Sequence, residues 1–303
     1  MSRELLPRTQ LRWLLAVVGR LGPVLLAALV GCRTAGPAAQ RLDVALTNTP
    51  ALVEQALLPS NQRNWSPDQA VLPYAVFNGD RVTIHNVRNC TYQSDTDYVV
   101  NHYDKTYDLN RLESVDFLVA PFTGSPKLAH TMMSFGFSDG DHLGVSVEAR
   151  LEDGETYSPI LGSLRQFELM YVLADERDLI VRRTRFRATD VYLYRTVATP
   201  MQAREMFVDV MDRVNKLYTE PEFYDTLTNN CTTNIAVHVN RLRSGRVPYE
   251  LRVLLPGLSD QLAYELGLLR TDSSFEETKR RAKITSLANQ HADSRDFSDR
   301  IRR

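Results

Sequence analysis

Hydrophobic and polar positions alternate with a period of two through the middle of the chain, and this alternation is typical of β-strands. The sequence Ser138-Asp139-Gly140-Asp141-His142 separates two of these segments, and Asp-Gly supplies the positive φ that a tight hairpin turn requires. We therefore predict a mainly antiparallel sheet. The expected strands are Arg81–Val87, Ser114–Phe122, Thr131–Phe137, Leu143–Arg150, Gln166–Leu173, Leu179–Arg187 and Val191–Val197.

The period changes to that of an amphipathic helix after residue 199. Thr199 is a cap residue, Pro200 suits the first helical position, and Pro221 lies past the expected end. Apolar residues recur between them at helical spacing, which predicts a long helix packed on the sheet. They are Ala203, Met206, Phe207, Val210, Met211, Val214, Leu217 and Tyr218.

A second helix is expected to begin at Cys231. Ile235, Val239 and Leu242 repeat at helical spacing behind it, so that Asn229 or Asn230 would cap the helix. Val237 and Val239 also alternate, so a strand is the alternative. Further on, 260–269 is expected to be an apolar helix, and the charged stretch 271–303 a surface element, either helical or disordered.

The first thirty-one residues have the pattern of an export signal. Four arginines precede an apolar run, Leu21–Val30, which ends in Leu29-Val30-Gly31-Cys32. This ending resembles the lipobox of bacterial lipoproteins, in which Cys32 would carry the lipid. We expect a lipidated tether over 32–60 and the folded domain over 61–303. An uncleaved anchor over Trp13–Val30 is the alternative, and both place the domain outside the cytoplasm.

Composition narrows the function classes. The chain has 303 residues, 43% of them hydrophobic and 24% charged, as in an ordinary globular protein of one generous domain or two small ones. The formal net charge of -1 gives no electrostatic case for a nucleic-acid partner. Because the histidines lack metal-ligand spacing with cysteine or carboxylate pairs, we expect neither a metal nor another cofactor.

Two segments about a hundred residues apart carry the candidate chemistry. Cys231 would lie in the first turn of a helix, where unpaired backbone N–H groups favour a thiolate. His130 begins a strand and could act as its base. The expected hairpin brings His130 within about one residue of opposite Glu148, a weaker third candidate that could instead pair with Arg150.

Four further residues are candidates for the surroundings of this site. Ser146 shares the Glu148 face of its expected strand, and Asn230 precedes the thiol. Arg88 would either contact an anionic substrate or form a structural ion pair, with the ion pair slightly favoured. Cys90 could line the site, lie inert in the core, or form a disulfide with Cys231.

These segments resemble the Lnb N-terminal periplasmic domain family, long catalogued as a domain of unknown function. The similarity covers roughly 65–302. The motifs that carry it are Leu128–Phe137, Ser146–Arg150 and Phe223–Thr233, joined by Asn64–Asp68, Asn86–Asn89 and the ending Phe297–Arg302.

The resemblance implies an α+β fold of the permuted papain-like, NlpC-type branch, in which the histidine strand precedes the cysteine helix. That branch includes thiol peptidases, amidases and acyltransferases. The family's name member is a lipoprotein N-acyltransferase. By motif, Cys231 would be the nucleophile and His130 the general base.

The resulting expectation is a periplasmic lipoprotein, held by its lipid on the membrane, on the outer membrane in a Gram-negative cell. It would transfer acyl groups through a thioester, with a phospholipid or a lipoprotein as substrate. Two alternatives remain: a thiol peptidase or amidase acting on cell-wall peptides, and a non-catalytic structural lipoprotein in which Cys90 and Cys231 are bridged.

Overall fold

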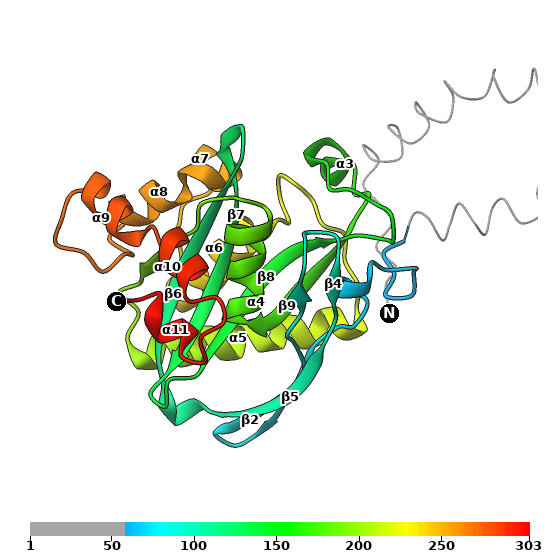
Figure 1. The fold of residues 1–303 in the computed structure, drawn as a ribbon, viewed down its shortest axis with the longest axis horizontal. Coiled ribbons are helices and arrows are strands. Elements are labelled where there is room, and N and C mark those ends of the chain that lie inside the picture. Colours follow the sequence, from blue (N-terminus) through cyan, green and yellow to red (C-terminus); the bar gives the residue numbers. More distant parts are fainter. Residues whose placement is uncertain (1–57) are drawn as a thin grey trace, which may run out of the picture. The chain divides into compact units, whose positions relative to one another are not determined.

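The computed structural model describes residues 58–303, and Cys32 with its expected signal and tether lies outside them. Residues Pro59–Arg303 form one compact unit built around an antiparallel sheet (Figure 1). The order of its strands is β1-β2-β9-β8-β7-β6-β10, and β5 pairs with the free side of β2. The only parallel contact among these strands joins β2 to β9.

The sheet strands are β1 (Tyr74–Asn78), β2 (Arg81–Arg88), β5 (His102–Asp108), β6 (Leu112–Phe122), β7 (Ser125–Phe137), β8 (His142–Arg150), β9 (Glu168–Asp175) and β10 (Tyr192–Arg195). A separate small ribbon pairs β3 (Thr91–Tyr92) with β4 (Tyr98–Val99). The helices are α3 (Pro159–Ser163), α4 (Glu176–Val181), α5 (Pro200–Thr219), α6 (Cys231–Leu242), α7 (Leu251–Leu254), α8 (Ser259–Glu265), α9 (Phe275–Ala282), α10 (Thr285–Gln290) and α11 (Phe297–Arg300).

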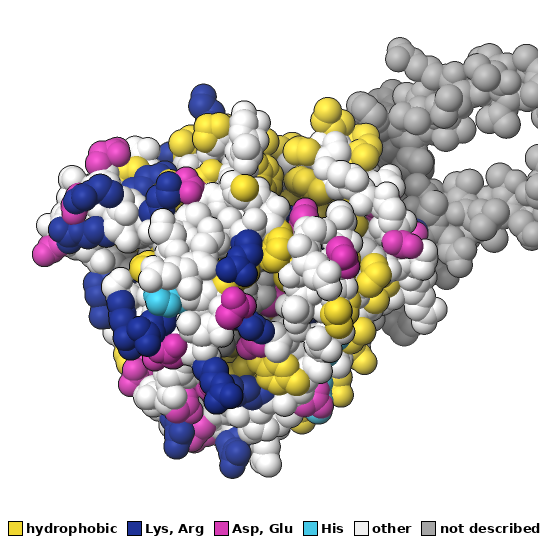
Figure 2. Space-filling model, in the orientation of Figure 1, with side chains coloured by type: hydrophobic (Ala, Val, Ile, Leu, Met, Phe, Trp, Pro, Cys, Tyr) yellow, Lys and Arg dark blue, Asp and Glu magenta, His cyan; other side chains and the backbone are white. Residues whose placement is uncertain are grey.

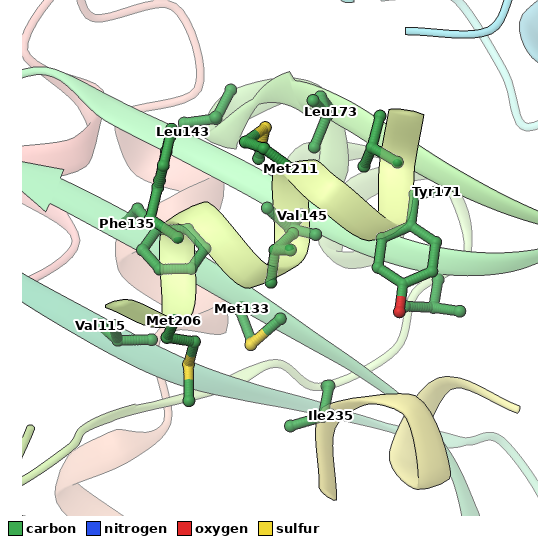
Figure 3. Packing of buried hydrophobic residues seen from close by; sticks show 14 of the residues in the cluster. Val115, Met133, Phe135, Leu143, Val145, Tyr171, Leu173, Met206, Met211 and Ile235 are labelled. Atoms are coloured by element: carbon green, nitrogen blue, oxygen red, sulfur yellow. The ribbon is translucent and has the colours of Figure 1, made fainter. Parts of the chain in front are cut away.

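Helices cover both faces of the sheet. The central strands carry apolar side chains on each of their two faces, so both faces must be shielded from water. On one face Met133 and Val145 pack against Met206 of α5 and Ile235 of α6 (Figure 3). On the other face Met132 and Val172 pack against residues of α4, α10 and α11. The fold is therefore α+β, with a largely antiparallel sheet between two helical layers.

The long helix and the central hairpin were predicted well. The helix α5 begins at Pro200, and Thr199 caps it in a capping box with Gln202. The hairpin turns at Asp139-Gly140, and Gly140 has a φ of +87°. The predicted strand Gln166–Leu173 corresponds to β9, which begins two residues later.

The predicted strand Leu179–Arg187 is wrong. This segment forms the end of α4 followed by a π-helical turn, Arg182–Phe186. Its apolar, β-branched residues favour a strand, but Glu176 and Asp178 lie in the first turn of α4 and Arg183 and Arg185 in the last turn of the π-helix. Charges of these signs stabilise a helix at its two ends.

The C-terminal segment is also more buried than predicted. Ile284, Ala288, Phe297 and Ile301 complete the second hydrophobic cluster, so that this segment is part of the core. Arg302 then reaches the sheet and forms ion pairs with the buried carboxylates of Asp116 and Glu176. Composition did not predict this burial, because the segment is rich in charged residues. These apolar residues are widely spaced in the sequence, yet they all face the core.

The strands β7 and β8 separate at one end of their hairpin. Their pairing ends at Met132 and Ser146, although β7 remains paired with β6 as far as Ala129. Over the same length β8 remains paired with β9. This fork in the sheet leaves room between two strands, and the N-terminus of α6 lies at it.

Candidate functional site

The helix α6 places a thiol at its first residue. Asn230 is the N-cap, and its side chain accepts a hydrogen bond from the backbone N–H of Thr233, whose hydroxyl in turn accepts one from the backbone N–H of Asn230. This capping box fixes the start of the helix one residue before Cys231. The Cys231 side chain is buried, and it is a free thiol.

The fork in the sheet brings His130 of β7 against two side chains of β8. His130 Nε2 lies 2.6 Å from Ser146 Oγ and 3.3 Å from Glu148 Oε1. Ser146 donates its hydroxyl proton to Glu148 Oε1 over 2.5 Å. The serine oxygen is then free to accept the proton of Nε2, so that Nδ1 is the imidazole nitrogen left to share a proton with Cys231.

An arginine that the sequence analysis did not single out holds the carboxylate. Arg183 Nη2 donates to Glu148 Oε1 over 3.0 Å, and its Nη1 donates to the carbonyl of Leu179 over 2.8 Å. Arg183 lies in the π-helical turn, an irregularity that is frequent at functional sites. The residues thus form a chain: Cys231, His130, Ser146, Glu148 and Arg183.

Electrostatics favour an ionised cysteine. Burial raises the pKa of the thiol, but the hydrogen bond and the charge of His130 outweigh burial and lower the pKa of Cys231 to about 7. Burial also lowers the pKa of His130, and here the Glu148 charge and the Cys231 hydrogen bond prevail, so that the imidazole pKa is raised. Burial opposes ionisation of Glu148 too, yet His130 and Arg183 keep its pKa well below the usual range.

Hydrogen-bond donors surround the sulfur. Thr131 stabilises the thiolate with both its hydroxyl and its backbone N–H. The backbone N–H groups of Cys231 and Thr232, in the first turn of α6, have no hydrogen-bond acceptor among residues 58–303. Two unoccupied N–H groups beside a nucleophile are the donors that an oxyanion requires.

Two tyrosines lie close to the thiol. The hydroxyls of Tyr157 and Tyr224 are 3.3 Å apart, and the rings meet edge to face with centroids 6.0 Å apart. Burial first, and then the nearby Cys231 charge, raise the pKa of Tyr224. Both tyrosines therefore remain neutral donors at physiological pH.

A cavity of about 310 Å³ lies next to Thr232, the residue that follows Cys231. Its walls come from α6, from β6 and β7, and from α7 and α8, and most of the side chains are apolar. Thr232 lines the cavity, and its hydroxyl is 3.8 Å from Cys231 Sγ and 3.0 Å from the Thr131 hydroxyl. The apolar lining includes Val115, Phe117, Met133, Met206, Ile235, Ala236, Val239, Leu242, Val247, Val253, Leu262, Leu266 and Leu269.

Two candidates have partners away from this chain of residues. Arg88 is buried in an ion pair with Asp178 at 2.7 Å, and it donates hydrogen bonds to Asp178 and to the carbonyl of Asp68. Cys90 lies beside the same carboxylate, and its backbone N–H donates to Asp178. Burial and the Asp178 charge raise the pKa of Cys90 to about 11, which makes it an inert, protonated thiol. Both Cys90 and Cys231 are free, so the expected alternative of a disulfide between them is wrong.

The comparison with family models agrees with the motifs. The model of the Lnb N-terminal periplasmic domain matches residues 99–257, which include Cys231, His130 and Glu148. The chain belongs to this family. The matched range is shorter than the similarity of 65–302 expected from the motifs, and it excludes Arg88. No curated protein and no solved structure shows a significant match to the chain.

The family is a periplasmic one, which agrees with the expected export of the domain. Between residues 58 and 303, no helix is long and apolar enough to cross a membrane. The same residues contain no group of three or more His, Cys, Asp or Glu side chains that could hold a metal ion. The lipidation expected at Cys32 lies outside the described residues.

Proposed function

We propose that this protein is a cysteine-dependent acyltransferase that carries a lipid acyl group as a thioester on Cys231. The observation that carries the proposal is the position of the apolar cavity, which begins one residue from a thiol of lowered pKa. A peptide stem would need a polar cleft with many hydrogen-bond partners, whereas a fatty acyl chain needs an apolar one. The lining therefore favours acyl transfer over the peptidase alternative.

The order of the elements supports a relationship with the permuted papain-like enzymes. The histidine strand β7 precedes the cysteine helix α6, and the helix begins with the nucleophile. Ser146 and Glu148 together occupy the place of the group that orients the imidazole in such sites. We propose the same chemistry for this chain on that ground.

In the first half-reaction the Cys231 thiolate attacks the carbonyl carbon of an ester, and a C–S bond forms. The oxyanion accepts hydrogen bonds from the backbone N–H groups of Cys231 and Thr232. When the intermediate collapses the C–O bond breaks, and His130, protonated at Nδ1, gives that proton to the leaving alkoxide. The product is an alcohol and an acyl-cysteine.

In the second half-reaction an amine attacks the thioester carbonyl and gives a proton to neutral His130. A C–N bond forms, the C–S bond breaks, and Cys231 leaves as the thiolate beside imidazolium. Glu148, held by Arg183, stabilises the imidazolium in both halves because its charge raises the pKa of His130. We propose a phospholipid or a lipoprotein diacylglyceryl group as donor and a lipoprotein α-amino group as acceptor. A lipid on Cys32 would hold the enzyme at the same membrane.

The test is mass spectrometry of the full chain after incubation with phospholipid vesicles. Wild type should gain an acyl mass on the peptide that contains Cys231, and hydroxylamine at neutral pH should remove it. Cys231→Ser should show no hydroxylamine-labile adduct, while Cys90→Ser should retain it. Absence of the adduct in wild type, together with cleavage of cell-wall peptides that depends on Cys231, would favour the peptidase alternative.

A further inference from the structure

Six large apolar side chains lie exposed around the N-terminal end of α6. They come from three segments that are distant in the sequence, and each has at least two fifths of its surface open to solvent. We call this set the exposed apolar patch. Its members are Ile160, Leu161, Leu164, Leu227, Tyr249 and Leu251.

Hydrogen bonds join the three segments and connect them to the candidate site. The Thr226 hydroxyl donates to the carbonyl of Pro159, at the start of α3, over 2.8 Å. Tyr249 Oη donates to the carbonyl of Leu227 over 3.3 Å. Asn230, the cap of α6, donates to the carbonyl of Thr226 over 2.6 Å. The patch is therefore built on the residues that precede Cys231.

The patch gathers on one side of the described domain. Figure 2 shows hydrophobic atoms over α3 and over α7 in the same part of the surface. The segment that exposes Tyr249 and Leu251 also contributes Val247 and Val253 to the apolar cavity. One stretch of chain thus faces the cavity with some side chains and the solvent with others. Large apolar side chains exposed together on one part of a surface mark an interaction site.

Charge identifies the partner. The three segments, 159–165, 225–228 and 243–252, contain four arginines and two acidic residues, although the whole chain has a net charge of -1. Arg165 lies near Asp225 and Arg252 pairs with Glu250. Arg243 and Arg246 have no carboxylate partner among the described residues. Exposed apolar side chains on α3, on α7 and on the loops next to them, in segments that carry arginines without a carboxylate partner, suit an anionic lipid surface.

We propose that the exposed apolar patch is a membrane-docking surface that inserts into the headgroup region of a phospholipid bilayer containing anionic lipid. The patch would hold the entrance of the site at the depth of the lipid headgroups. This binding does not depend on the reaction at Cys231, so it can be measured with a variant that cannot form a thioester.

The experiment is hydrogen exchange with mass spectrometry on the full-length Cys231→Ser protein. Exchange is measured alone, with phosphatidylcholine vesicles, and with vesicles that also contain phosphatidylglycerol. Because the readout is local, binding through the N-terminal residues does not obscure it. We expect slower exchange in 159–165, 225–228 and 243–252 with vesicles, and a larger effect with phosphatidylglycerol. The hairpin that carries the exposed Val76 and Phe77 should be unchanged.

Matched variants test the side chains themselves. The double variant Ile160→Ser, Leu164→Ser should need at least tenfold more lipid than the parent protein to reach the same protection. The double variant Val76→Ser, Phe77→Ser should need the same lipid concentration as the parent. Vesicle-bound protein without protection in the three segments would overturn the proposal. Protection that instead rises with protein concentration in the absence of vesicles would assign the patch to a second copy of this chain, and would also overturn it.

Discussion

Glu148 lies across the fork in the sheet from His130, with its Oε1 atom 3.3 Å from His130 Nε2. The register of the paired part of β7 and β8, continued by two residues, would place these two residues directly opposite each other. The two strands have separated at this point, so the imidazole lies at the fork while His130 remains paired with Ala120 of β6. It can then contact Glu148 through one nitrogen and the thiol of α6 through the other.

The thiolate should be detectable by its reactivity. We expect the rate of alkylation of Cys231 by iodoacetamide to rise with pH through a midpoint near its pKa of about 7. Cys90, with a pKa of about 11, should remain unmodified over the same range. Peptide mass spectrometry on native protein separates the two. In His130→Asn the midpoint should rise, because burial, the largest influence on this thiol, is then opposed only by the hydrogen bonds of Thr131. An unchanged midpoint in that variant would contradict the assigned pair.

Removal of the Glu148 charge should narrow the active pH range. The reactive pair exists above the pKa of Cys231 and below that of His130, and Glu148 raises the latter. Glu148→Gln should therefore shift the alkaline limb of the rate profile to lower pH and reduce the rate at its maximum by roughly tenfold or more. Glu152→Gln, a change at a partly exposed carboxylate nearby on the chain, is the control and should leave the limb in place. The position of the limb is informative because it does not depend on the fraction of folded protein.

The cavity should select the length of the acyl chain. Ala236→Phe adds a ring to the cavity wall, five residues along α6 from the thiol, and should shift the preference of thioester formation toward shorter chains. Val237→Phe is the matched control, because Val237 is the neighbouring residue but is exposed and does not line the cavity. Competition between acyl donors of different length, resolved by adduct mass, is the measurement. If both substitutions had the same effect, the cavity would not be the part of the protein that holds the acyl chain.

Arg302 should matter for stability far more than its place in a charged tail suggests. Arg302→Met leaves the buried carboxylate of Glu176 without its cation and deprives Asp116 of one of two. Loss of one partner of a buried ion pair costs about 3–5 kcal/mol of unfolding free energy. Arg300→Met removes only an exposed pair with Asp296 and should change the unfolding free energy little, because solvent screens such pairs. Urea unfolding of both variants gives the comparison, and similar midpoints would refute the role of Arg302.

The sequence carries strong local information about the hairpin and the two principal helices. Asp139-Gly140, Thr199-Pro200 and Asn230 specify turns and caps through neighbouring residues alone. The family motifs gave Cys231 and His130, and the structure brings these residues together with Glu148 and Ser146.

Long-range contacts were the part that the sequence did not reveal. Arg183 lies thirty-five residues from Glu148 in a segment with strand-like composition, and only its unusual density of arginines hinted at a role. The cavity forms where α6, α7 and α8 meet β6 and β7, and Arg302 meets carboxylates more than a hundred residues away. No local sequence pattern encodes these long-range contacts, since each depends on how separate elements pack against one another.

The helix α6 has one further consequence, because it holds the nucleophile at its first residue and then runs along the cavity. Ile235, Val239 and Leu242 line the cavity at successive turns behind Cys231. With a rise of about 1.5 Å per residue, Leu242 stands roughly 16 Å along the axis from the thiol. Distance along the helix axis from the sulfur would therefore set how long an acyl chain the cavity accepts. Substitutions at successive turns of α6 should change that length step by step, without disturbing the capped end of the helix, where bonds form and break.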